Sequence, residues 1–130
     1  MKTLTIFKLA FAYLAGVIGY WVGGYDIMSK TMLTIMVLDF LTGIGQAIFN
    51  GKFNCKKCAK GIMKKVFILF TVALSVVIQH FMGDNIPIRE VVVMFYIVNE
   101  GMSTLENIGK VHEYPAKLKN IFEELQNRNE

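Results

Sequence analysis

The sequence predicts an all-α, polytopic membrane protein with four transmembrane helices and a short amphipathic helix at the carboxyl end. Three observations support this fold class. Apolar residues make up 54% of the 130 residues and charged residues 18%, with a mean hydropathy of +0.45. The apolar residues gather in four long segments, and the basic residues gather between the second and third segments and in the tail. A soluble chain of this length cannot bury so much apolar surface, so we infer that lipid solvates it.

The four apolar segments cover residues 4–22, 31–49, 66–82 and 86–108. About twenty helical residues cross a hydrocarbon core of roughly 30 Å. The first three segments fit this length, the third with little to spare, and its flanking lysines can extend its reach by snorkelling. The fourth contains several carboxyl and amide groups, so it can span only where protein or water meets its polar face. We therefore expect a transmembrane domain at 1–109 and a cytoplasmic tail at 110–130.

The basic residues predict the orientation of the chain. Four crossings place the amino terminus, the second loop and the tail on one side, and that side holds eleven of the fourteen basic residues. The loop contributes Lys52, Lys56, Lys57, Lys60, Lys64 and Lys65. The positive-inside rule then puts both termini in the cytoplasm. This distribution indicates membrane topology rather than nucleic-acid binding, although the net charge is +4.

The tail contains a second kind of helical pattern. Leu118, Ile121, Phe122 and Leu125 recur at spacings of three and four residues after Pro115, which suits a first helical position. This pattern predicts an amphipathic helix over about residues 115–126. Such a helix lies on the membrane surface or packs on a neighbouring subunit. A largely solvated tail is the alternative.

Small residues form a stripe on the first segment. Ala12, Gly16, Gly19 and Gly23 follow spacings of four, three and four residues, which keeps them on one helix face. In lipid, small residues let helix backbones approach closely, so the stripe is a candidate helix-packing face. Ordinary tolerance of glycine in membrane helices is the alternative interpretation.

Polar residues within the second and fourth segments are the candidates for a pore lining or an oligomer interface. They are Asp39, Thr42, Gly43 and Gln46 in the second segment and Asn99, Glu100, Ser103, Glu106 and Asn107 in the fourth. A carboxylate at membrane depth is costly unless it is protonated, paired or hydrated, so Asp39 is a functional candidate. The polar face of the fourth segment lines an aqueous path when copies meet, or is sealed inside the helix packing. The sequence leaves both possibilities open.

No pattern of catalytic or metal-binding residues is present. Cys55 and Cys58 have the spacing of a zinc knuckle, but the sequence has no second cysteine pair to complete four ligands. We expect two reduced thiols, with a metal site between subunits as the alternative. A Gly-rich phosphate loop, a Ser-His-Asp arrangement and a His-Glu-x-x-His motif are missing from the sequence. We therefore expect neither an enzyme nor a cofactor.

Four motifs carry a resemblance to a known family. In order, they are Asp39-Phe-Leu-Thr-Gly43, Gly61-Ile-Met-Lys64-Lys65, Asn99-Glu-Gly-Met-Ser103-Thr-Leu-Glu106-Asn107 and Pro115-Ala-Lys-Leu-Lys119. They resemble the Asp-x-x-Thr-Gly, Gly-x-x-Lys-Lys, Asn-Glu-Gly-x-Ser-x-x-Glu-Asn and Pro-x-x-Leu-Lys elements of the toxin-secretion/phage-lysis holins, also called holin family 4. The resemblance covers about residues 33–125, and the third motif is the most specific. His80 departs from it, because an acidic residue is expected near the end of the third segment.

The resemblance implies a function that composition and periodicity do not. Proteins of this family, including clostridial toxin-export holins, are homo-oligomers in the bacterial cytoplasmic membrane. They open lesions that let an endolysin or a large toxin leave the cell, so the implied partners are the lipid bilayer, further copies of the chain and one of these enzymes or toxins. Two other classes stay open. One is a small-ion channel or transporter subunit with Asp39 and Glu100 as conduction residues, and the other is a membrane adaptor for a cytosolic protein.

Overall fold

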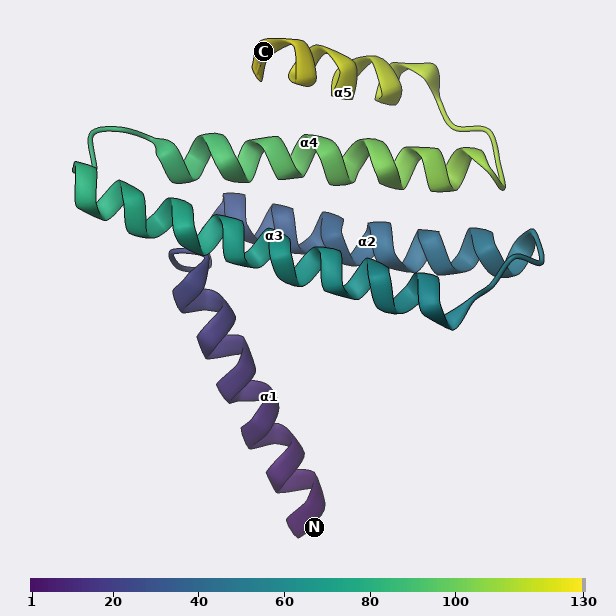
Figure 1. Ribbon diagram of the computed structural model, residues 1–130. Helices are drawn as coiled ribbons and strands as arrows, with labels where there is room; N and C mark the ends of the chain where they lie inside the picture. The colour runs from purple at the N-terminus through teal and green to yellow at the C-terminus, as the bar shows by residue number, and fades with distance from the viewer. Residues whose placement is uncertain (130) are drawn as a thin grey trace.

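The computed structural model describes residues 1–129, which form five helices and contain no strand. The helices are α1 (Lys2–Trp21), α2 (Ile27–Phe49), α3 (Cys55–Met82), α4 (Ile88–Gly109) and α5 (Ala116–Asn129). In Figure 1, α2, α3 and α4 lie side by side with alternating direction, while α1 leaves this group at an angle and α5 runs back along α4. The all-α prediction is confirmed.

Local sequence signals explain where the helices begin and end. The Asp26 carboxylate accepts a hydrogen bond from the Ser29 amide (2.9 Å) and caps α2, and the side-chain Oδ1 of Asn54 accepts one from the Lys56 amide (2.9 Å) and caps α3. Gly23 and Gly24 have φ of 82° and 101°, which other residues rarely adopt. These glycines let the chain turn sharply between α1 and α2.

The third helix is longer than the sequence predicted. It begins at Cys55 rather than at residue 66, so Lys56, Lys57, Lys60, Lys64 and Lys65 belong to α3, and the prediction that they lie in a loop is wrong. The reason is that lysine is a good helix former and Asn54 supplies the cap. The 28 residues of α3 extend about 42 Å, which exceeds the roughly 30 Å of a hydrocarbon core. Its basic first turns therefore extend beyond an apolar layer.

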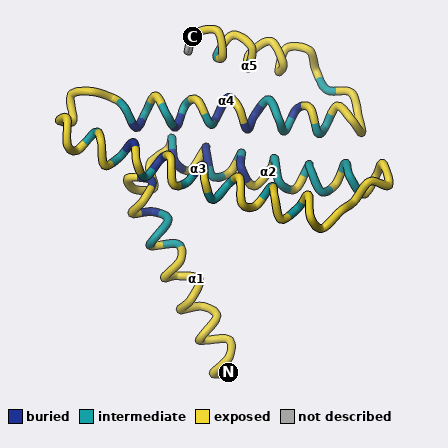
Figure 2. The backbone as a smooth tube through the Cα atoms, viewed as in Figure 1, coloured by how far each residue is buried: buried dark blue, intermediate teal, exposed yellow. Residues whose placement is uncertain are grey.

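A small apolar core joins α2, α3 and α4. Its buried side chains are Val22, Met32, Met36, Ile68, Val72, Val93 and Ile97. Most other large apolar side chains are exposed, and Figure 2 shows that α1 is exposed along most of its length. Helices α1, α2 and α3 are long and apolar enough to cross a membrane, whereas α4 does not meet that criterion. The prediction of four crossings therefore stays a prediction.

Glycines shape two helix contacts. The ring of Phe122 in α5 lies over Gly101 in α4, where a Cβ atom would collide with it. Helix α5 thus packs on its own chain in this structure. Gly19 of α1 lies against the ring of Tyr25, and Gly23, in the turn after α1, lies against the Arg89 side chain.

The remaining members of the predicted stripe, Ala12 and Gly16, are exposed, and no other atom lies within 4 Å of a Cβ built at Gly16. The stripe therefore divides within one chain. Gly19 and Gly23, at its carboxyl end, pack against Tyr25 and Arg89, whereas Ala12 and Gly16, nearer its amino end, are exposed.

Candidate functional site

A buried charge network joins the three central helices. The Lys65 ammonium of α3 donates to Asp39 Oδ2 of α2 at 2.8 Å and to a carboxylate oxygen of Glu100 in α4. The side chains of Lys65, Asp39 and Glu100 are only 16%, 15% and 6% exposed. Asp39 and Glu100 lie near the middle of their helices. One ammonium group therefore serves two carboxyl groups in the interior of the bundle.

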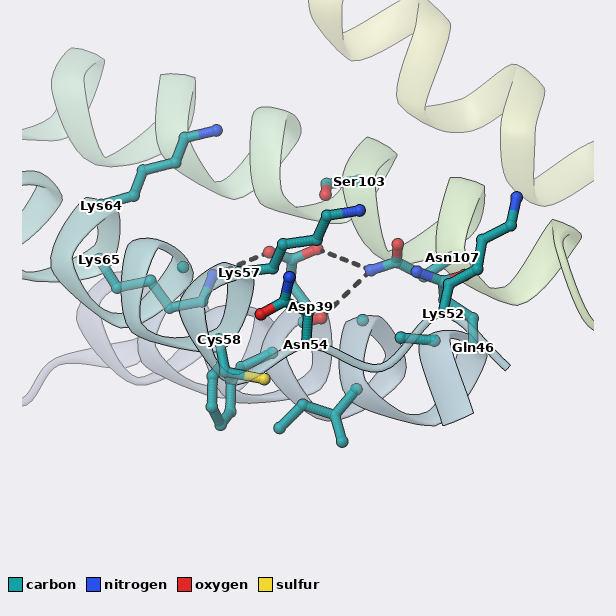
Figure 3. A pocket seen from close by; sticks show the side chains of 15 residues that line it. Asp39, Gln46, Lys52, Asn54, Lys57, Cys58, Lys64, Lys65, Ser103 and Asn107 are labelled. Atoms are coloured by element: carbon teal, nitrogen blue, oxygen red, sulfur yellow. Dashed lines mark hydrogen bonds and ion pairs between the residues drawn. The ribbon is translucent and has the colours of Figure 1, made fainter. Parts of the chain in front are cut away.

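The side-chain amide of Asn107 extends this network along α4. The Asn107 amide donates to Asp39 Oδ1 (3.1 Å) and to Thr42 Oγ1 (3.2 Å). Figure 3 shows Lys65 and Asn107 reaching Asp39 from opposite sides. Ions at membrane depth are tolerable only when they are paired and hydrogen-bonded, and this arrangement satisfies Asp39 within a single chain.

An open cavity of about 210 Å³ lies beside the network, where α2 and α4 end and α3 begins. Its polar lining consists of Asp39, Gln46, Lys52, Asn54, Lys57, Lys64, Lys65, Ser103 and Asn107 (Figure 3). A second cavity of about 200 Å³ between α3 and α4 is lined partly by Lys64, Asn99 and Glu100. The cavities and the charge network place most of the predicted polar residues in one region of the bundle.

A second ion pair lies at the other end of the bundle. The Arg89 guanidinium of α4 binds both carboxylate oxygens of Asp26 at 2.9 and 3.0 Å, and its Nε donates to the Val22 carbonyl oxygen. The Arg89 amide donates to Gln79 Oε1 of α3. The pair therefore ties the turn between α1 and α2 to the start of α4 and the end of α3.

Comparison with known proteins decides the family. The model of the bacteriophage holin family matches residues 16–127. The chain belongs to this holin family. The matched region contains the whole charge network, the cavities and the Asp26–Arg89 pair.

Relatives of this holin-family chain occur in Listeria, Clostridium and a Bacillus phage. An uncharacterised protein of Listeria innocua is 32% identical over 90% of this chain and 84% of the relative. An uncharacterised 14.9 kDa protein of Clostridium perfringens is 31% identical over 87% of this chain and 88% of the relative. A protein of Bacillus phage phi105 named a probable holin is 27% identical over 80% of this chain and 71% of the relative. No solved structure matches.

Family membership and three apolar helices identify a membrane protein. Membership also points to a protein without enzymatic activity. Within residues 1–129, no group of three or more His, Cys, Asp or Glu side chains is arranged to hold a metal ion. Cys55 and Cys58 are free thiols in the first turns of α3, and Cys58 lines the larger cavity.

The predicted face of α4 in this holin-family chain divides into two. Glu100 is buried, Ser103 and Asn107 are half-buried and line the larger cavity, and Asn99 and Glu106 are exposed. In α2, Asp39, Thr42, Gly43 and Gln46 all face the network or that cavity. The division arises because the five polar residues spread over about a third of the circumference of a helix, of which α2 and α3 cover only a part.

Sequence reasoning missed three members of the two ion networks. Lys65 was assigned to a loop, and the pairing of Arg89 with Asp26 was not foreseen. A signal for the second pair was available, because Asp26 and Arg89 lie at the starts of the second and fourth segments, on the same side of the predicted topology. The sequence signal for Lys65 was weaker, because Lys65 is one of several neighbouring lysines. Only the rotation of α3 about its axis brings Lys65, rather than one of its neighbours, to the carboxyl groups of the network.

The Asp26–Arg89 pair predicts a pH dependence of stability. The guanidinium beside Asp26 holds the pKa of that carboxyl well below its ordinary value of 3.8. A depressed pKa in the folded state gives stability that is present above the unfolded value and is lost as pH falls below it. We expect Asp26→Asn, which keeps the helix cap, to cost about 1 kcal/mol at pH 7, because screening limits the half-exposed carboxylate. The cost should shrink steadily below about pH 4.

Thermal unfolding of the purified protein in detergent, followed by circular dichroism across this pH range, measures the effect. Asp84→Asn is the control, because the Asp84 side chain is 77% exposed and its one ion-pair partner among residues 1–129 is His80, at 3.5 Å. An Asp26→Asn cost that stays constant down to the acid limit of the fold would contradict the assignment.

Proposed function

We propose that this protein is a holin that assembles from identical copies in the bacterial cytoplasmic membrane and opens a lesion. The lesion lets a murein-degrading endolysin, or a large toxin, leave the cytoplasm. The observation that carries the proposal is the match to the bacteriophage holin family over residues 16–127. The phage relative named a probable holin supports it. The buried network explains how a chain with charged groups at membrane depth can rest in a membrane before opening.

The proposed arrangement has four crossings, with residues 1–109 in the membrane and both termini in the cytoplasm. The cavity end of the bundle then faces the cytoplasm together with the basic first turns of α3, in agreement with the positive-inside rule. The Asp26–Arg89 pair lies at the outer end. Pairing of Glu100 with Lys65 is what allows α4 to cross despite its charges.

The position of α5 indicates which surface of α4 is in contact with water or with another copy. Phe122 rests on Gly101, well inside the span of α4, while α5 exposes the ion pairs Lys119–Glu123 and Arg128–Glu124. Charged side chains do not face lipid, so the α4 surface next to α5 fronts water or another copy in the assembly. In this proposal the α4 surface next to α5 faces other copies rather than lipid.

The lesion opens when contacts between copies of the chain replace contacts within a single copy. Asp39, Glu100 and Asn107 are satisfied internally at rest, so their polar groups are unavailable to line a path. As copies crowd, shared hydrogen bonds and water can satisfy these groups instead. Opening then depends on surface density, which gives a delay followed by a sudden collapse of the membrane potential.

Induced expression in bacteria tests the function. A potential-sensitive dye reports ion permeability, and a cytosolic reporter enzyme reports lesions large enough for a folded protein. We expect a delay, an abrupt loss of potential and release of the reporter enzyme. Loss of potential without release of the enzyme, even beside a cognate endolysin, would favour a small-ion channel. Normal insertion with an intact potential throughout would favour a membrane adaptor.

A further inference from the structure

The larger cavity carries surplus positive charge. Lys65 is engaged by Asp39 and Glu100, but Lys52, Lys57 and Lys64 also line the cavity and form no ion pair among residues 1–129. Figure 3 shows Lys57 extending over the cavity, with Lys64 on one side of it and Lys52 on the other. Three exposed lysine side chains around one hollow repel each other, so the site favours an anion.

Further donors surround the same hollow. The carboxamides of Gln46 and Asn54 line it, and α3 begins beside it at Cys55. Apart from the Lys56 amide, which Asn54 caps, the first turn of α3 presents amide groups and the positive end of the helix dipole, which suit a phosphate group. The three lysines and the amino-terminal end of α3 therefore both favour a bound negatively charged group.

The remaining lining identifies the kind of anion. Phe40, Ile44 and Ala47 of α2 form an apolar wall of the cavity. A free phosphate ion gains nothing from such a wall, whereas a phospholipid places apolar glycerol and acyl groups beside its phosphate. Basic pockets between membrane helices at the cytoplasmic side are suited to anionic headgroups.

We propose that this cavity binds the headgroup of an anionic phospholipid, with its phosphate among Lys52, Lys57 and Lys64. The inference rests on the membrane arrangement given under the proposed function, because that arrangement brings the cavity to the level of the headgroups. The apolar wall formed by α2 then receives the upper part of the acyl chains.

Native mass spectrometry of the full chain in mild detergent tests this site. The protein is mixed with phosphatidylglycerol, with zwitterionic phosphatidylethanolamine, or with phosphatidylglycerol and excess inorganic phosphate. The test variant is Lys57→Gln/Lys64→Gln. The matched control is Lys56→Gln/Lys60→Gln, which makes the same charge change on the same helix at residues that do not line the cavity.

We expect the unmodified chain and the control to retain phosphatidylglycerol at least about tenfold more than the test variant, the loss expected when two phosphate contacts disappear. Lys57→Arg/Lys64→Arg should restore retention. Equal losses in test and control variants, equal retention of both lipids, or displacement by inorganic phosphate would overturn the proposal. If the test variant fails to fold, the same comparison is made with the single changes Lys57→Gln and Lys56→Gln.

Release of the reporter enzyme is measured for the same variants, which keeps the two proposals apart. A chain that releases the enzyme but shows no preference for phosphatidylglycerol would overturn the lipid site and leave the holin function standing. A chain that retains phosphatidylglycerol selectively but never permeabilises cells would support the lipid site and overturn the holin function.

Discussion

Lys65→Met is expected to lower the free energy of unfolding by about 3–5 kcal/mol, the cost of leaving a buried ion network without its counter-charge. Without the ammonium, the carboxyl groups of Asp39 and Glu100 face each other in the interior with no cation between them. They must then take up protons or draw water into the bundle. In cells we expect poor accumulation or premature loss of the membrane potential.

Unfolding in mixed micelles with increasing denaturing detergent, followed by circular dichroism, measures the stability difference. Lys64→Met is the matched control, because it makes the same change one residue away at an exposed position that forms no ion pair among residues 1–129. It should cost less than about 1 kcal/mol, as surface changes usually do. Equal costs for the two variants would show that the network does not stabilise the fold.

Glu100→Gln is expected to act in the opposite direction and delay opening. One ammonium serves two carboxyl groups, so the interior must hold either a surplus negative charge or an extra proton. Glutamine removes this requirement, keeps the shape of the side chain and leaves the Lys65–Asp39 pair intact. Removing an uncompensated buried charge should stabilise the resting fold by about 1 kcal/mol. A more stable resting state needs a higher surface density before it opens.

The time from induction to collapse of the membrane potential measures this delay at matched protein levels. Glu106→Gln makes the same chemical change on the same helix, but Glu106 is exposed and lies outside the network. We expect its timing to stay close to that of the unmodified chain. If Glu106→Gln shifted the timing more than Glu100→Gln, the exposed face of α4 would control opening rather than the buried network.

These two predictions depend on contacts that sequence patterns do not specify. The fourth segment predicted a helix with polar residues on one side, and the structure contains that helix as α4. Its polar side, however, meets two environments: Glu100 is buried beside Lys65, and Glu106 is exposed. Helical spacing defines a face, but it does not say how much of that face the neighbouring helices cover.

The sequence by itself determined the fold class, the membrane character and the family of this protein. Helix formation and solvation by lipid depend on runs of neighbouring residues, and the four family motifs can be recognised from their residues alone. Only the tertiary structure decided which polar groups meet. Asp39 and Lys65 are 26 residues apart and Lys65 and Glu100 are 35 apart, so their contact depends on how α2, α3 and α4 are rotated and shifted against one another. That alignment arises from packing of side chains from all three helices at once, which no single segment encodes.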